Sequence, residues 1–114
     1  MEMQYSELDN GIRLIKLSGT FDIIGTGAIE TRFACYCSGE NTRVMVDLSA
    51  VDFLASIGIR LLVLTAKSLA SRRGRMVLLN PIPEVYNVLE ITGIPDIIPI
   101  YSSLESAETV LLAS

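Results

Sequence analysis

The sequence contains no histidine, the side chain that most often serves as a general acid or base in enzymes. Its acidic residues are scattered, and no group of them has the spacing of metal ligands. The segment Gly25-Thr26-Gly27 lacks the lysine and the spacing of a phosphate-binding loop, and no dinucleotide-binding fingerprint follows a predicted strand. We therefore expect no enzymatic activity, no cofactor and no metal. An unrecognised small-ligand enzyme would need a pocket with convergent ionisable groups.

Basic charge and long hydrophobic runs are also scarce. The net charge of −4 argues against binding to nucleic acid, because phosphate backbones are bound by basic faces. No apolar run reaches about 18 residues, and no basic and then apolar leader opens the sequence. We therefore expect a cytoplasmic protein that does not insert into a membrane. The basic cluster Arg72-Arg73-Gly74-Arg75 falls at a predicted helix end, where we expect it to be solvated.

Cysteine occurs only twice, as Cys35 and Cys37. Residues two apart on a helix point to nearly opposite sides, so this pair is badly placed for a mutual disulfide or a shared metal. We expect two small, semi-buried thiols in a reducing compartment.

Apolar side chains, by contrast, are abundant: 50% of the 114 residues are hydrophobic and 19% are charged. This composition predicts a packed core, and the length suits one domain over residues 1–114. Periodicity and turn residues predict the following elements. The first part of the chain is predicted to form a hairpin of Met3–Glu7 and Ile12–Leu17, a turn at Ser18–Asp22, and a helix that is capped by Thr26 and ends at Ser38-Gly39. The middle part is predicted to form a strand at Arg43–Leu48, a well-buried helix at Ser56–Arg73 and a strand at Met76–Leu79. The last part is predicted to form a helix from Pro83 to Gly93 whose inner face includes Thr92, an edge strand at Ile97–Tyr101, and a final helix whose capping box is Ser102-Ser103-Leu104-Glu105.

The order of these elements indicates the fold class. Strands and helices alternate after the first hairpin, and such alternation is typical of parallel strands joined by right-handed helical crossovers. We therefore predict an α/β domain, with a mixed sheet of about five strands and about four helices packed on it.

Ser56 is the residue whose position most suggests a function. Functional groups of open α/β sheets collect beyond the carboxyl ends of the strands, and Ser56 follows a predicted strand at the start of the next helix. One interpretation is structural, since serine is a preferred helix N-cap. The other is phosphorylation, because a phosphate there would meet free backbone N–H groups. Its charge would then be felt by a partner docked over the nearby apolar residues Phe53, Leu54 and Ile57.

The stretches Val46-Asp47-Leu48-Ser49-Ala50-Val51-Asp52-Phe53 and Ser56-Ile57-Gly58-Ile59-Arg60-Leu61-Leu62 resemble the signature of STAS domains, the anti-sigma factor antagonist family. The segment Leu17-Ser18-Gly19-Thr20-Phe21-Asp22 resembles that family's Gly-x-x-Asp turn, and Leu78-Leu79-Asn80 with Thr92-Gly93-Ile94 resembles its final part. The similarity covers nearly the whole chain in the right order.

The resemblance implies a phosphorylation switch. In this family the unphosphorylated antagonist binds an anti-sigma factor that is also a serine kinase, and so frees a sigma factor. Phosphorylation by that kinase breaks the complex, and a phosphatase resets it. The contact surface implied for this chain comprises Asp22, Phe53, Leu54, Ala55, Ile57, Gly58 and Arg60. Asp22 has a structural alternative, because aspartate in a turn before a helix often satisfies local backbone donors. Arg60 lies near the positive end of its helix dipole, which indicates an outward contact with a partner or phosphate.

The family's usual motif is Asp-Ser-Ser/Thr-Gly, with the phosphate on the hydroxyl directly before glycine. Here the matching residues are Ala55-Ser56-Ile57-Gly58, and Ile57 cannot accept phosphate. Two interpretations follow: Ser56 is the acceptor, as in a related stressosome subgroup, or the switch is lost and binding is constitutive. A different role, as a stressosome-type scaffold or a transporter-associated subunit, is the alternative function. The oligomeric state is left open by the sequence.

Overall fold

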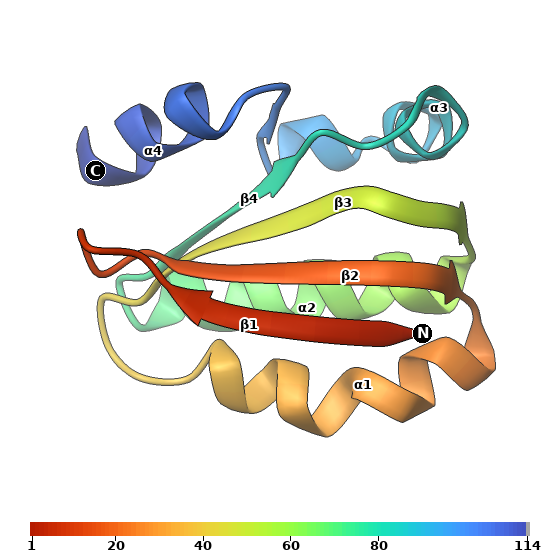
Figure 1. Cartoon of the computed structure of the whole chain (residues 1–114), viewed down its shortest axis with the longest axis horizontal. Helices are drawn as coiled ribbons and strands as arrows, with labels where there is room; N and C mark the ends of the chain where they lie inside the picture. Colours follow the sequence, from red (N-terminus) through yellow and green to blue (C-terminus); the bar gives the residue numbers. More distant parts are fainter. Residues whose placement is uncertain (114) are drawn as a thin grey trace.

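The computed structural model describes residues 1–113. In this part of the chain the strands are β1 (Glu2–Glu7), β2 (Arg13–Phe21), β3 (Arg43–Leu54), β4 (Arg75–Leu79) and β5 (Ile100–Tyr101). The helices are α1 (Ile23–Tyr36), α2 (Ser56–Ser71), α3 (Pro83–Ile91) and α4 (Leu104–Ala113), and a short 3₁₀ turn, η1 (Ile94–Asp96), follows α3 (Figure 1).

The strands form one mixed sheet in the order β1-β2-β3-β4-β5. The β1–β2 hairpin is antiparallel, and the remaining pairs are parallel and connected through helices. The predicted mixed α/β fold is therefore confirmed. The predicted edge position of the last strand is also confirmed, although β5 spans only Ile100–Tyr101 because the preceding residues form η1 and the bend after it.

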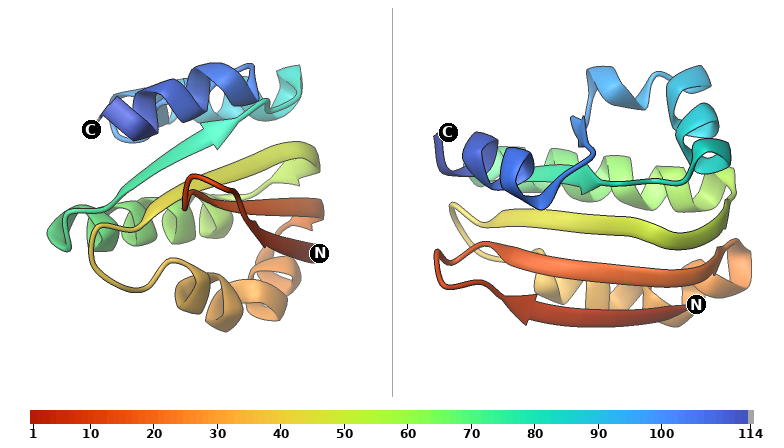
Figure 2. Two further views of the ribbon diagram at one scale, coloured as in Figure 1. Left: turned by 60° about the vertical axis from the view of Figure 1, so that its left-hand side comes forward. Right: turned by 45° about the horizontal axis from the view of Figure 1, so that its top comes forward.

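Helices cover both faces of the sheet. Helices α1 and α2 lie side by side on one face, and α4 lies on the opposite face (Figures 1 and 2). Successive side chains of β3 point to opposite faces of the sheet. Val44 and Val46 belong to the core beneath α1 and α2, whereas Met45 packs with α4. Beyond the last β4 pair, Asp47 with Leu79, β3 continues beside β2, and α3 packs on it.

Two hydrophobic clusters fill these layers. The smaller one, between the sheet and α4, contains Ile12, Met45, Val77, Leu79, Ala107 and Leu111. The larger one lies under α1, α2 and α3 and includes Phe21, Ile29, Phe33, Leu48, Leu62, Leu69, Val85 and Leu89. None of the helices in residues 1–113 is long and apolar enough to cross a membrane.

Two predicted strand ends were wrong. Residues 18–21 do not form a turn, because β2 continues to Phe21 and pairs with β3 up to Leu54. For the same reason β3 does not stop at Leu48. The β2–β3 pairing contains two register shifts, one between Lys16 and Ser18 and one between Gly19 and Thr20. Such irregularities change which face of the sheet a strand residue points to, so the ends of both strands do not follow a simple period of two.

The predicted helix caps also need correction. Thr26 is not the cap of α1: it is buried in the first turn, and its Oγ1 has no hydrogen-bond partner among the described residues. Helix α4 is capped by Ser103, whose Oγ accepts the N–H of Ser106 at 3.2 Å, rather than through Glu105. At the end of α3, Thr92 is exposed and does not extend the inner face.

Helix α2 is less buried than predicted. Only Gly58, Leu62 and Leu69 are buried along it, and Leu64 is 53% exposed. The helix ends at Ser71, and the following Arg73 adopts a left-handed conformation with φ of 63°. Apolar residues occur around most of the circumference of α2, but this does not bury the helix on every side. One side of α2 packs on the sheet, and another side faces solvent beside α1.

Candidate functional site

Two strand-to-helix joints lie next to each other at one end of the sheet. Strand β2 leads into α1 and strand β3 leads into α2, and the two strands are paired as far as Phe21 and Leu54. The N–H of Ala55 donates to the carbonyl of Phe21 at 2.9 Å, which ties the second joint to the first. The sequence-predicted site residues 22 and 53–60 are thus brought together at the carboxyl ends of neighbouring parallel strands, where functional sites of such sheets collect.

Asp22 holds the first joint. Its carboxylate accepts the backbone N–H of Gly25 at 2.8 Å, which makes it the N-cap of α1. This contact supports the structural interpretation of Asp22, since an aspartate cap satisfies an otherwise free backbone donor. Asp22 is only partly exposed, so its contribution to a surface is limited.

Ser56 stands at the second joint, and the structural interpretation that it caps α2 was wrong. The N-cap is Ala55, which has no polar side chain, and Ser56 is the first residue of the helix. Ser56 is exposed, and its hydroxyl makes no hydrogen bond within residues 1–113. The N–H groups of Ser56 and Ile57 also lack an acceptor there. The hydroxyl is therefore free for other chemistry.

Several of the predicted contact residues are buried beneath the surface at this end of the molecule. Leu54 is 5% exposed and belongs to the core. Gly58 is buried, and a Cβ on it would come within 2.7 Å of Cδ1 of Phe21. Gly25 is as tightly placed, since a Cβ there would lie 2.2 Å from the carbonyl oxygen of Thr20. These residues let both helices start close to the strand ends, and Leu54 and Gly58 are themselves buried and offer no exposed surface to a partner.

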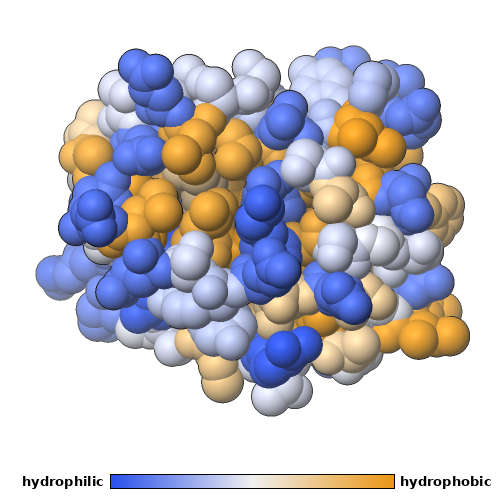
Figure 3. All heavy atoms as spheres, in the orientation of Figure 1, coloured by the Kyte–Doolittle hydropathy of each residue, from blue (hydrophilic) through white to orange (hydrophobic). Residues whose placement is uncertain are grey.

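The exposed surface at this end is apolar. Among the predicted contact residues Phe53 is 54% exposed, and two residues that sequence reasoning missed are more exposed still: Ile23 at 72% and Ile24 at 82%. Hydrophobic side chains gather over the beginning of α1 at the right-hand end of the molecule (Figure 3). The sequence feature that could have indicated this exposed apolar surface is the isoleucine pair directly after Asp22. We call Ile23, Ile24, Phe53, Ser56 and Arg60 the rim.

A groove runs from the rim between α1 and α2. Its volume is about 630 Å³, and it is lined by Glu30 of α1 and by Ser56, Ile57, Arg60, Leu61 and Leu64 of α2. Glu30 and Arg60 are both exposed, and neither forms an ion pair with any other residue that the structure describes. Ile57 is half-buried in this groove, which leaves Ser56 as the hydroxyl at its mouth.

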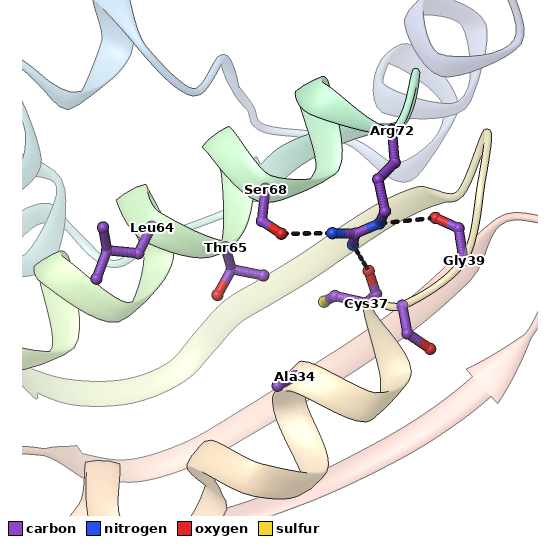
Figure 4. Close-up of a pocket in the computed structure, with 8 residues that line it drawn as sticks. Ala34, Cys37, Gly39, Leu64, Thr65, Ser68 and Arg72 are labelled. Atoms are coloured by element: carbon purple, nitrogen blue, oxygen red, sulfur yellow. Dashed lines mark hydrogen bonds between the residues drawn. The ribbon is translucent and has the colours of Figure 1, made fainter.

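A second pocket lies toward the other ends of the two helices, where Leu64 lines both cavities and Arg72 lines the second one (Figure 4). The guanidinium of Arg72 donates to the carbonyl oxygens of Gly39 at 3.0 Å and Cys37 at 2.7 Å, and also to Oγ of Ser68. Arg72 was expected to be solvated, and that prediction was wrong. It binds the carbonyls that the end of α1 leaves without helical partners.

The two thiols differ. Cys35 is exposed and Cys37 is buried, so the prediction that both thiols are semi-buried was wrong; both are free in the structure. Burial raises the pKa of Cys37 from 9.0 to about 12, although the positive charges of Arg13 and Arg72 act to lower it. Cys37 therefore remains a neutral thiol at physiological pH.

Catalytic and metal-binding arrangements are not evident at this end. Within the described part of the chain, no three His, Cys, Asp or Glu residues are placed to hold a metal ion. What the joint offers chemically is a free hydroxyl beside an apolar surface, with a cation one helical turn away.

Comparison with known proteins identifies the family. The sequence profile described as the STAS domain matches residues 6–107. BtrV of Bordetella bronchiseptica, whose name describes it provisionally as an anti-sigma factor antagonist, is 31% identical over 107 residues, covering 94% of this chain and 91% of its own length. The anti-sigma-B factor antagonist of Listeria monocytogenes is 27% identical and is covered over 88% of both chains. The crystal structure of an anti-sigma factor antagonist from Mycobacterium paratuberculosis superimposes with a TM-score of 0.87 at 25% identity, over 97% of this chain and 93% of that one. This chain belongs to the STAS domain family.

Proposed function

We propose that this protein is an anti-sigma factor antagonist: it binds a kinase-type anti-sigma factor through the rim and so releases a sigma factor. Phosphorylation of Ser56 breaks that complex, and a phosphatase restores it. The relatives named as anti-sigma factor antagonists support the general role. The observation that carries the proposal is the position of a free, exposed hydroxyl, Ser56, within an apolar rim at the strand ends.

The rim has the character of a protein-binding surface. Ile23, Ile24 and Phe53 present apolar surface on two neighbouring joints, and such exposed apolar patches mark interaction sites. Because Asp22, Gly25 and Gly58 fix the two helix starts, the rim is held in place before a partner arrives. A preorganised surface loses less conformational entropy on binding.

The phosphate acceptor in this proposal is Ser56 rather than Ile57. Isoleucine has no hydroxyl, and Ile57 is half-buried, whereas Ser56 is exposed with its hydroxyl unengaged. Transfer of the γ-phosphoryl group from ATP would form the bond from Oγ to phosphorus, break the bond to the ADP oxygen and release the hydroxyl proton. The added charge of about −1.5 to −2 would lie beside apolar side chains that a partner must desolvate.

The test is to incubate the purified protein with candidate kinase-type anti-sigma factors, with and without ATP. Complexes are detected by size-exclusion chromatography, and phosphate is located by mass spectrometry, with Ser56→Ala as the control. We expect a complex without ATP, and phosphate on Ser56 with ATP. Binding without phosphate on Ser56 would keep the antagonist role and remove the switch. Failure to bind any such kinase would overturn the proposal.

A second function is favoured by the two departures at the joint, Ala55 and Ile57. A domain without the usual acceptor could serve as a stressosome-type scaffold or a transporter-associated subunit. The two roles differ in size. A very large homogeneous assembly in light scattering would indicate the scaffold, whereas a small species that joins an anti-sigma kinase would indicate the antagonist.

A further inference from the structure

The groove between α1 and α2 brings together a hydroxyl group, a cation and a carboxylate. Ser56 and Arg60 line it from α2, and Glu30 lines it from α1. None of the three forms an ion pair or a side-chain hydrogen bond with another described residue. Arg60 is also the only cation that lines this groove within residues 1–113. An arginine near the start of a helix is unfavourable with respect to the dipole, so its position requires another reason.

The spacing of Ser56 and Arg60 supplies that reason. Residues four apart on a helix lie on the same face, with Cβ atoms roughly 5–6 Å apart. An anionic side chain placed N-terminal to a cation at this spacing is the favourable orientation of such a pair. Unmodified serine carries no charge, so the pair becomes an ion pair only when Ser56 is phosphorylated. The residue four positions after Ile57 is Leu61, so no cation is placed to pair with a phosphate at residue 57 in this way.

We propose that Arg60 is the internal counter-ion of a phosphate on Ser56 and is withdrawn from the partner when that phosphate is added. The inference rests on the proposed phosphorylation of Ser56 and specifies how it regulates the rim. In the unmodified protein the guanidinium is exposed at the mouth of the groove and is free to meet an acidic group of the partner. In the phosphorylated protein it pairs with the phosphate. Modification therefore removes a positive contact from the partner as well as adding a negative charge.

Glu30 opposes this arrangement from the other side of the groove. Glu30 lines the same groove as Arg60. Because its carboxylate has the same sign of charge as the phosphate, it disfavours the doubly ionised phosphate. Replacing Glu30 should therefore strengthen the pairing of phosphate with Arg60, and replacing Arg60 should abolish it. The two substitutions change the ionisation of the phosphate in opposite directions.

The test uses full-length protein with phosphoserine installed synthetically at residue 56, so that it requires neither the kinase nor the partner. Phosphorus NMR follows the second ionisation of the phosphate, whose ordinary pKa is about 6. We expect Arg60→Gln to raise this pKa by about half a unit, and Glu30→Gln to lower it. Raising the salt concentration should shrink the effect of Arg60→Gln. Lys67→Gln, which removes an exposed cation elsewhere on α2, is the matched control and should leave the pKa unchanged.

An equal pKa with and without Arg60 would overturn the counter-ion role, as would an equal shift from Lys67→Gln. Circular dichroism of each variant checks that the fold is intact. The result is separable from the proposed function. If a kinase phosphorylates Ser56 and the complex dissociates, but the pKa of the phosphate is the same with and without Arg60, only the counter-ion inference fails. If the pKa responds to Arg60 but no anti-sigma kinase binds the protein, the proposed function fails instead.

Discussion

Gly58 at the start of α2 lies directly against the ring of Phe21 at the end of β2: a Cβ on residue 58 would come within 2.7 Å of Cδ1 and 2.8 Å of Cγ of that ring. The helix can begin over the strand only because residue 58 has no side chain. The glycine of the family motif thus has a packing role here. The absence of a side chain at residue 58 determines how closely the start of α2, with Ser56, packs on the sheet.

This relationship predicts that Gly58→Ala destabilises the protein. The added methyl group must displace a buried aromatic ring or lift the helix, at a cost of about 1–3 kcal/mol in the free energy of unfolding. Gly27→Ala is the control, since a Cβ on Gly27 meets nothing within 4 Å and alanine favours a helix. We expect that variant to be neutral or slightly stabilised in urea denaturation. Equal stability of the two variants would contradict the packing role.

The rim predicts a second result, on binding rather than stability. Ile24→Ser and Phe53→Ser replace exposed apolar side chains, so the free energy of unfolding should change by less than about 0.5 kcal/mol. If both side chains are buried against the partner, each substitution should weaken the affinity for the anti-sigma kinase at least about tenfold. Ile91→Ser on α3 is the control, because Ile91, at 85%, is about as exposed as Ile24 but lies outside the rim. A loss of affinity as large with Ile91→Ser would show that the rim is not the contact surface.

Arg72 predicts a difference between two adjacent arginines. Arg72→Gln removes donors to two carbonyls at the end of α1, and we expect it to lower the free energy of unfolding by about 1–2 kcal/mol. Arg73→Gly removes the same charge from the same turn. Because Arg73 has φ of 63°, glycine relieves a left-handed strain, and the variant should be neutral or up to about 1 kcal/mol more stable. Thermal melts of both variants decide the point. Similar destabilisation by both would mean that charge, rather than the hydrogen bonds, accounts for the effect.

The cysteines predict a difference in reactivity. Cys35 is exposed and should react with a thiol reagent in the folded protein at pH 8, whereas Cys37 should react only on unfolding. The unfolded state ionises the Cys37 thiol above about pH 9, while the folded state keeps it neutral up to about pH 12. The free energy of unfolding should therefore fall as pH rises through this window. Cys37→Ala should remove that part of the pH dependence. Fast labelling of Cys37 in the native state would contradict its burial.

The prediction of the fold from sequence succeeded where patterns were local and failed where pairing was irregular. The apolar run Val44-Met45-Val46 lies within the predicted strand Arg43–Leu48, and in the structure that strand packs against helices on both faces of the sheet. The end of β3 was missed because its buried residues after Leu48 are Val51 and Leu54, three apart. The shifted β2–β3 register produces this spacing, and a period of two cannot reveal it.

The site was predictable in position and less so in detail. The joint around Ser56 followed from a strand before a helix and from the family resemblance. The free hydroxyl did not, because serine at a helix start is usually a cap, and only the backbone shows that Ala55 takes that place. The exposure of Ile23 and Ile24 depends on how α1 is turned on the sheet. Arg72 looked solvated because the loop that it binds is distant in sequence.

In the proposed function, the rim binds a kinase-type anti-sigma factor and phosphate on Ser56 ends the binding. The most direct measurement is isothermal titration of that partner with two forms of the protein, unmodified and carrying phosphoserine at residue 56. We expect tight binding of the unmodified form and an affinity at least about a hundredfold lower for the phosphorylated form, since a desolvated charge costs several kcal/mol. Equal affinities of the two forms would contradict the proposal.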